Sequence, residues 1–167
     1  MIDPQSLIST ARLLLGESNK GAPNQTRLRR AVSTAYYALF HSILRSASDA
    51  FVGANQRARP RYETMYRGFE HRLMKESSAT IDKPTLGAKA ARAMGATQVS
   101  QEIRDVASVF VSLQDRRHWA DYVPSGKITR SEARDLVDLS EFAASQLRAA
   151  DSDERRNFLA YLMHGSR

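Results

Sequence analysis

Two long stretches of this sequence, residues 24–52 and 98–121, repeat apolar residues at helical spacing without a glycine or proline to interrupt them. The second stretch carries a stripe at successive intervals of four, three, four and three, formed by Val99, Ile103, Val106, Phe110 and Leu113. Because an α-helix has about 3.6 residues per turn, this spacing puts the whole stripe on one face. The alternation of apolar and polar residues that marks β-strands is nearly absent, so the sequence predicts an all-α protein.

Helix-start signals predict where the N-terminal helices begin. Asp3 suits the N-cap position and Pro4 suits the first helical position, so a helix is expected from there to about Leu15. After a polar loop, either Asn24 or Thr26 can cap the first of the two long helices.

The C-terminal part of the chain carries the same kind of signal twice. Thr129, with Glu132 three residues later, forms a capping box that predicts a helix to about Ala149. Asp151 is a second N-cap residue, followed by acidic residues in the first turn, and it predicts a short final helix over 152–163.

The region between the two long helices is less regular. We expect one shorter helix over about 61–76, followed by an irregular insertion around 77–97 that contains a proline and two glycines and holds at most one short helix around 84–93. The predicted architecture is an antiparallel four-to-five-helix bundle in one domain, with its core in about residues 3–150.

Composition excludes several classes of site. The chain has no cysteine, which rules out disulfides, zinc–thiolate centres and cysteine nucleophiles. The N-terminus lacks the pattern of a signal peptide and no apolar run is long enough to span a bilayer, so a cytoplasmic protein is expected. Of the net charge of +7, most comes from residues 57–92, with nine basic and four acidic side chains. This segment is either a solvated basic surface or a surface that attracts a polyanion such as RNA.

The long helix over 24–52 has two different faces. Its apolar flank consists of Leu28, Val32, Ala35, Tyr36, Leu39, Ile43 and Ala47. The opposite side gathers polar groups within about 40° of each other, namely Arg30, Tyr37, His41 and Ser48. Two interpretations are open: Tyr37 and His41 are half-buried packing or dimer contacts, or they face a phosphate-bearing ligand or a symmetry mate.

In the helix over 98–121, a guanidinium takes the next position of the apolar stripe. Arg117 would be costly there unless it is paired or opens onto a cleft, and Asp121, four residues later, can pair with it. His118 and Tyr122 share the same spacing on the adjacent side. The cluster is either a structural ion pair that ties helices together, with Trp119 plugging the bundle, or a functional site.

Two segments of these helices resemble the signatures of small prokaryotic HEPN proteins. The segment Arg30 to His41 has an arginine followed by a Tyr-Tyr-Ala-x-Phe-His core, and the segment Arg117 to Tyr122 reads Arg-x-x-Ala-Asp-Tyr near the end of the later long helix. His71 falls where the family often has a histidine that opens its middle helix. The resemblance covers roughly residues 5–150.

The HEPN resemblance implies a four-to-five-helix bundle that commonly dimerises, with the later long helices of two subunits around a shared cleft. Many members are metal-independent endoribonucleases, often toxins paired with a minimal nucleotidyltransferase antitoxin. Other members bind nucleotide or protein without cleaving anything. The resemblance therefore predicts an RNA-directed homodimer without a cofactor or, alternatively, a non-catalytic module that binds a nucleotidyltransferase partner or a nucleotide.

The chain departs from the family's usual motif, an arginine followed after four to six residues by a histidine. None of its histidines has an arginine five to seven positions earlier. Arg116 and Arg117 instead precede Tyr122 by six and five positions, which resembles the arginine–tyrosine variant of HepT-type toxins. In that variant the tyrosine can also be a target of nucleotide transfer by the partner enzyme.

Cleavage of RNA through its own 2′-hydroxyl needs a proton acceptor and a cation near the developing phosphorane charge. An imidazole with a pKa of about 6.5 suits proton transfer better than a phenol with a pKa of about 10, which favours His118, whereas the resemblance favours Tyr122. Along an unbroken helix Arg116 and Tyr122 lie about 120° apart, so they converge only if the helix bends near Asp121 or if Tyr122 completes a site across a dimer. No metal-binding motif is apparent. The predicted catalytic residues are Arg116, Arg117, His118, Asp121 and Tyr122, and the predicted RNA-binding or dimer-cleft residues are Arg30, Tyr37, His41 and His71.

Overall fold

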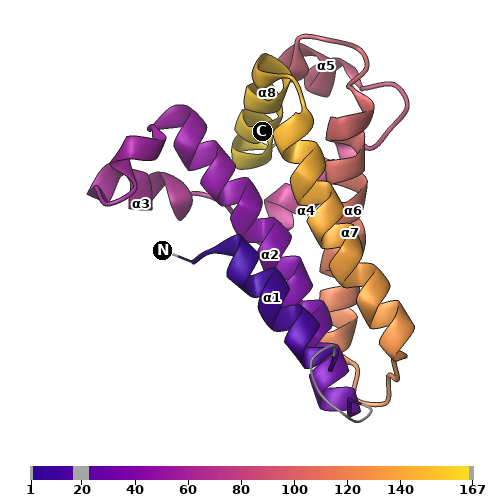
Figure 1. Ribbon diagram of the computed structural model, residues 1–167. Coiled ribbons are helices and arrows are strands. Elements are labelled where there is room, and N and C mark those ends of the chain that lie inside the picture. Colours follow the sequence, from indigo (N-terminus) through magenta and orange to yellow (C-terminus); the bar gives the residue numbers. More distant parts are fainter. Residues whose placement is uncertain (1, 17–22, 166–167) are drawn as a thin grey trace.

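A computed structural model describes residues 2–16 and 23–165. Within these ranges the chain forms helices and their connections, with no strand, which confirms the all-α prediction (Figure 1). The α-helices are α1 (Pro4–Leu14), α2 (Gln25–Phe51), α3 (Pro60–Tyr66), α4 (His71–Ile81), α5 (Ala88–Met94), α6 (Gln101–Tyr122), α7 (Arg130–Ala149) and α8 (Ser152–His164), and a 3₁₀ turn, η1 (Ala54–Gln56), follows α2.

Helix α2 is the centre of the bundle. It packs against α1, α6 and α7, and α6 also packs against α7 (Figure 1). The chain reverses direction between α1 and α2 and again between α6 and α7 (Figure 1). As a result the end of α6 lies beside the first half of α2, which brings residues 117–122 close to residues 30–41. No helix in residues 2–16 and 23–165 has the length and apolar character that a bilayer crossing requires.

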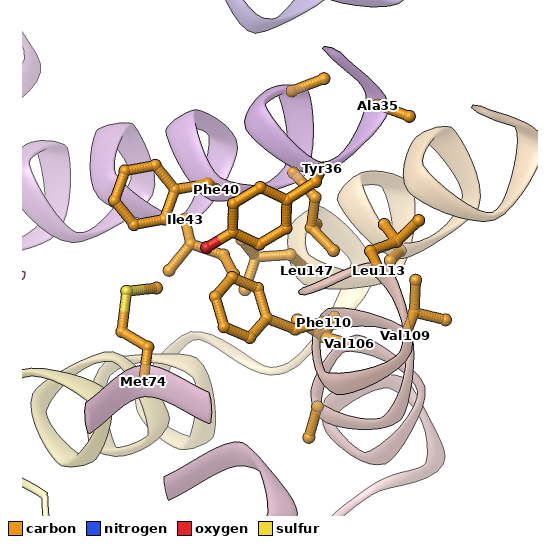
Figure 2. Close-up of a cluster of buried hydrophobic side chains, with 14 of the residues drawn as sticks. Ala35, Tyr36, Phe40, Ile43, Met74, Val106, Val109, Phe110, Leu113 and Leu147 are labelled. Carbon is orange, nitrogen blue, oxygen red and sulfur yellow. The ribbon is translucent and has the colours of Figure 1, made fainter. Parts of the chain in front are cut away.

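The core forms where the apolar flank of α2 meets the apolar stripe of α6. Tyr36 and Phe110 are fully buried and face each other, with ring centroids 5.6 Å apart (Figure 2). Met74 from α4 and Leu147 from α7 belong to the same buried cluster (Figure 2). Every residue of the predicted α6 stripe is buried. The periodicity of the sequence therefore located the core face of both long helices correctly.

Side-chain caps set most helix boundaries where the sequence predicts them. The carboxylate of Asp3 accepts the backbone N–H of Ser6 at the start of α1, and Asn24 caps α2 in the same way. Thr129 and Glu132 form the predicted capping box of α7. Helix α6 begins later than predicted, because the hydroxyl of Ser100 caps the N–H of Ile103. Helix α8 has the predicted Asp151 cap.

The prediction of one helix over 61–76 is wrong. The chain forms two helices there, α3 and α4, joined by a short connection that buries Phe69. The break lets α3 pack against α2 while α4 packs against α6 and α8. The irregular insertion is also shorter than predicted, because α4 continues to Ile81 and α5 occupies Ala88–Met94. Gly95 ends α5 with a φ of +70°, a left-handed backbone conformation that glycine adopts with less strain than any other residue.

Candidate functional site

Arg117 lies near the C-terminal end of α6, where the buried stripe ends, and its guanidinium has two protein partners. One Nη donates a hydrogen bond to the hydroxyl of Tyr37 at 3.0 Å. Its Nε lies 2.9 Å from Oδ2 of Asp121, so the ion pair predicted from the four-residue spacing is present. The side chains of Arg117 and Asp121 are 23% and 21% exposed. The guanidinium is therefore held at the edge of the core and is not free in solvent.

The other carboxylate oxygen of Asp121 connects this pair to α2. Oδ1 accepts a hydrogen bond of 2.6 Å from the hydroxyl of Ser33, which is itself buried. Two bonds, Tyr37 to Arg117 and Ser33 to Asp121, thus tie the end of α6 to the first half of α2. Ser33 was absent from the sequence-based candidates, and nothing in its local pattern distinguishes it from an ordinary helical serine.

Three tyrosine rings surround the Arg117 guanidinium. Its central carbon lies 5.5 Å from the ring centroid of Tyr37 and 5.9 Å from those of Tyr36 and Tyr122. Such cation–π contacts favour a cation between the rings. Tyr36 is fully buried and Tyr122 is 62% exposed, so this group of residues extends from the core to the surface. We call Ser33, Tyr36, Tyr37, Arg117, Asp121 and Tyr122, together with the two histidines described next, the Arg117 site.

His71, at the start of α4, lies on the buried side of the Arg117 site. Its Nδ1 is 2.5 Å from the hydroxyl of Tyr36, and its ring stacks on Phe40 with centroids 4.1 Å apart. Burial lowers the pKa of His71, and the positive charge of Arg117 lowers it further. Burial raises the pKa of Tyr36 well above its ordinary value, against the influence of Arg117. The phenol therefore stays protonated and shares a hydrogen bond with a neutral imidazole.

His41 forms the second histidine–tyrosine pair. Its Nδ1 lies 2.8 Å from the hydroxyl of Tyr66 in α3, and its ring stacks on that ring and on the ring of Tyr37. Burial lowers the pKa of His41, and nearby His71 contributes to the same shift. Burial raises the pKa of Tyr66 to about 12. Both histidines of the Arg117 site are thus held in their neutral form by burial.

Not every residue predicted on the polar side of α2 joins this site. Tyr37 and His41 do, but Arg30 is exposed two helical turns before Tyr37. Ser48 is fully buried, and its hydroxyl has no hydrogen-bond partner among the described residues. The partners of Tyr37 and His41 come instead from α3, α4 and α6. Helical spacing identified the face correctly but not its extent.

The remaining predicted catalytic residues divide into two groups. The exposed ring of His118 lies 4.9 Å from that of Tyr122, so these two side chains are together. Helix α6 continues unbroken through Tyr122, and the bend that would bring Arg116 to Tyr122 is absent. The guanidinium of Arg116 lies over the ring of Trp119 instead, 5.1 Å from its centroid. Within one chain, therefore, Arg117 and not Arg116 reaches Tyr122.

Trp119 and Arg29 hold the end of α6 in place. The Arg29 guanidinium donates hydrogen bonds to the carbonyl of Ala120, one of the groups that a helix end leaves without an intrahelical partner, and to the carbonyl of Val123, which follows the helix. Trp119 packs against the edge of the core, which fits its predicted role in the bundle, and lies so close to Gly126 that a Cβ there would be 2.3 Å from its ring. These contacts fix where Arg117 and Tyr122 sit.

The Arg117 site combines a cation, several phenols and two neutral imidazoles. Such a set can bind an anion or transfer a proton; Tyr122 is its solvent-facing member, and exposed His118 lies beside that ring. Among residues 2–16 and 23–165, no group of three or more histidine, aspartate or glutamate side chains is arranged to hold a metal ion. No protein-family model, curated protein or solved structure matches this chain.

The two neutral histidines make stability depend on pH. A histidine whose pKa is lowered in the folded state takes up protons more readily when the chain unfolds, so its contribution to stability is complete above about pH 6.5 and decreases below that value. We expect the melting temperature to fall as the pH drops below about 6.5, because His41 and His71 take up protons more readily in the unfolded chain than in the folded one. The His41→Asn/His71→Asn double variant, melted across the same range, should show a shallower dependence. Equal slopes for the two proteins would contradict this origin.

Proposed function

We propose that this chain is an RNA-directed protein of the HEPN type, and that it acts as a metal-independent endoribonuclease of a toxin–antitoxin or defence system. The supporting observation is that the two HEPN-like segments, although about 80 residues apart in the sequence, meet at one site. Tyr37 of the first segment receives a hydrogen bond from Arg117 of the second, and Ser33 donates one to Asp121. The proposal includes the homodimer, with the ends of the two α6 helices lining a common cleft.

In the proposed reaction, Arg117 stabilises charge on the scissile phosphate, and His118 accepts the proton of the 2′-hydroxyl. The 2′-oxygen attacks phosphorus, the bond from phosphorus to the 5′-oxygen breaks, and Tyr122 protonates that oxygen. The products are a 2′,3′-cyclic phosphate and a 5′-hydroxyl. His118 returns its proton to the Tyr122 phenolate, whose ring centroid lies 4.9 Å from its own. Both groups are exposed, as contact with an RNA chain requires.

Variants of the exposed residues test this proposal without disturbing the core. The purified protein should degrade total RNA in the presence of EDTA, and Tyr122→Phe and His118→Ala should each reduce the initial rate by about 100-fold or more, the usual contribution of one acid–base group. His164→Ala is the matched control for His118→Ala, because His164 is an exposed histidine at the end of α8, outside the Arg117 site. A wild-type protein that neither cleaves RNA nor retains it on a filter would refute the proposal.

A second candidate function is a non-catalytic HEPN module that binds a nucleotidyltransferase partner or a nucleotide. The observation that favours it is that Asp121 already balances the charge of Arg117, and Ser33 holds Asp121 in place. In this alternative the Arg117 site stabilises the fold and only exposed Tyr122 meets a partner. Intact RNA after incubation, together with a stable complex with a nucleotidyltransferase on gel filtration, would favour this alternative.

A further inference from the structure

A cavity of about 600 Å³ lies between α1, α2, α7 and the start of α8, and it shares no lining residue with the Arg117 site. Helix α1 packs along α2 (Figure 1), and it begins at Pro4, which itself lines the cavity. Beyond that point the walls carry small side chains, which leave the space unfilled: Ala38, Ser42 and Ser46 on α2, and Ser140 and Ala144 on α7. The volume is in the range of sites that bind small organic molecules.

The carboxylates in the cavity wall are already neutralised by other groups of the chain. Asp49 pairs with Arg57 and also accepts the hydroxyl of Tyr62. Glu141 pairs with Arg12 at 2.6 Å. Asp3 caps α1 through Ser6 and has Arg45 3.3 Å away. The wall therefore offers no unpaired carboxylate that would attract a cationic ligand.

Positive charge is in excess at the mouth of the same cavity. Arg155 donates to the carbonyls of Leu147, Arg148 and Ala150 through a single nitrogen, Nη1. These bonds hold its guanidinium at the end of α7 but do not neutralise its charge. Exposed Arg148 has no hydrogen bond or ion pair to any other side chain in the described part of the chain. Arg148 thus lines the opening without a carboxylate partner, whereas Arg155, on the next helix, has an electrostatic interaction with Asp151 one turn earlier.

The floor beneath these arginines is apolar. Ile8, Ala38 and Leu147 are nearly fully buried where they line the cavity, and the serines of α2 add hydroxyl groups beside them. A ligand that fits this arrangement has an anionic end and an uncharged organic body. Guanidinium groups present several N–H donors in a planar fork, which suits the oxygens of a phosphate group.

We propose that this cavity binds a small phosphate monoester, with its phosphate against Arg148 and Arg155 and its organic body over the floor formed by Ile8, Ala38 and Leu147. The phosphate supplies the anionic partner that Arg148 lacks and a second one for Arg155. The organic body fills the space that the small side chains of α2 and α7 leave open. Binding here is independent of the Arg117 site and does not require that the protein act on RNA.

Calorimetric titration of the full chain tests this inference. Two monoesters, 5′-AMP and 4-nitrophenyl phosphate, are the ligands, and adenosine and inorganic phosphate are the controls. We expect saturable binding of at least one monoester, and at least tenfold weaker binding of adenosine and of inorganic phosphate. Absence of saturable binding by both monoesters, or equal affinity for inorganic phosphate, would overturn the proposal.

Two variants test whether the monoester binds in this cavity. Arg148→Ala should weaken binding about tenfold, because it removes one charge-assisted hydrogen bond. Ala144→Leu should weaken it at least as much by filling the space. Lys83→Ala, which removes an exposed cation outside the cavity, should leave binding unchanged. Because Arg148 is exposed, its variant tests the proposal even if Ala144→Leu fails to fold. Unchanged affinity in Arg148→Ala would show that the monoester binds elsewhere and would overturn the proposal.

Discussion

Replacing Arg117 by alanine is expected to lower the free energy of unfolding by about 2–3 kcal/mol and the melting temperature by about 5–10 °C. The variant leaves Asp121 with its carboxylate only 21% exposed and without its ion-pair partner, and it removes the hydrogen bond to Tyr37. Loss of one member of a fully buried pair costs about 3–5 kcal/mol, and the partial exposure of this pair reduces that figure. Thermal unfolding at pH 7 measures the change.

The neighbouring arginine provides the matched control for this prediction. Arg116→Ala removes the same charge from the same helical turn, but its main contact is the face of Trp119, worth about 0.5–1 kcal/mol. The double variant Arg117→Ala/Asp121→Asn should recover part of the loss, because no unpaired carboxylate remains. If Arg117→Ala and Arg116→Ala had the same melting temperature, Arg117 would not be the link between α2 and α6.

The Arg117–Asp121 pair was predictable because it is a local feature. Its four-residue spacing on one helix face brings the two side chains together wherever that helix packs. The helix starts were equally local, since Asp3, Thr129 and Asp151 each cap a helix through a residue two or three positions later. Features of this kind depend on neighbours in the sequence, and the sequence analysis located them nearly to the residue.

The break between α3 and α4 is of a different kind. No proline interrupts residues 61–76 and helical periodicity continues across Gly68, so this periodicity predicts one helix there. The chain instead gains more by burying Phe69 and by letting α3 and α4 pack against different helices. Tertiary packing of this kind overrides local helix propensity, and the local signal that accompanies it, Gly68 directly after the last turn of α3, was not used in the prediction.

The same limit explains which members of the Arg117 site were missed. Ser33 and Asp121 are 88 positions apart, and Tyr36 and His71 are 35 apart. Tyr36 was correctly predicted as a core residue from its apolar face, but its hydroxyl also has a specific partner from another helix. A buried tyrosine generally finds a hydrogen-bond partner, so the need for one was predictable, whereas its identity depended on where α4 packs.

Tyr36 is therefore the residue for which we expect the largest loss of stability. Tyr36→Ala should lower the free energy of unfolding by about 3–5 kcal/mol, because it leaves a cavity among Phe40, Phe110 and the Arg117 guanidinium and removes the partner of His71. Tyr36→Phe keeps the ring and removes only the hydroxyl, so it should cost about 1–2 kcal/mol, the usual cost of leaving one buried group unpaired.

Urea unfolding of the two variants at pH 7, compared with the wild type, separates packing from hydrogen bonding at this position. The control is Tyr161→Phe, a buried tyrosine on α8 outside the Arg117 site, with no side-chain hydrogen bond among the described residues, and it should change stability by less than about 1 kcal/mol. If Tyr36→Phe were as stable as the wild type, the bond to His71 would contribute nothing. In that case the ring alone, through its contacts with Phe110 and Arg117, would account for the role of Tyr36 in joining the core to the surface of the Arg117 site.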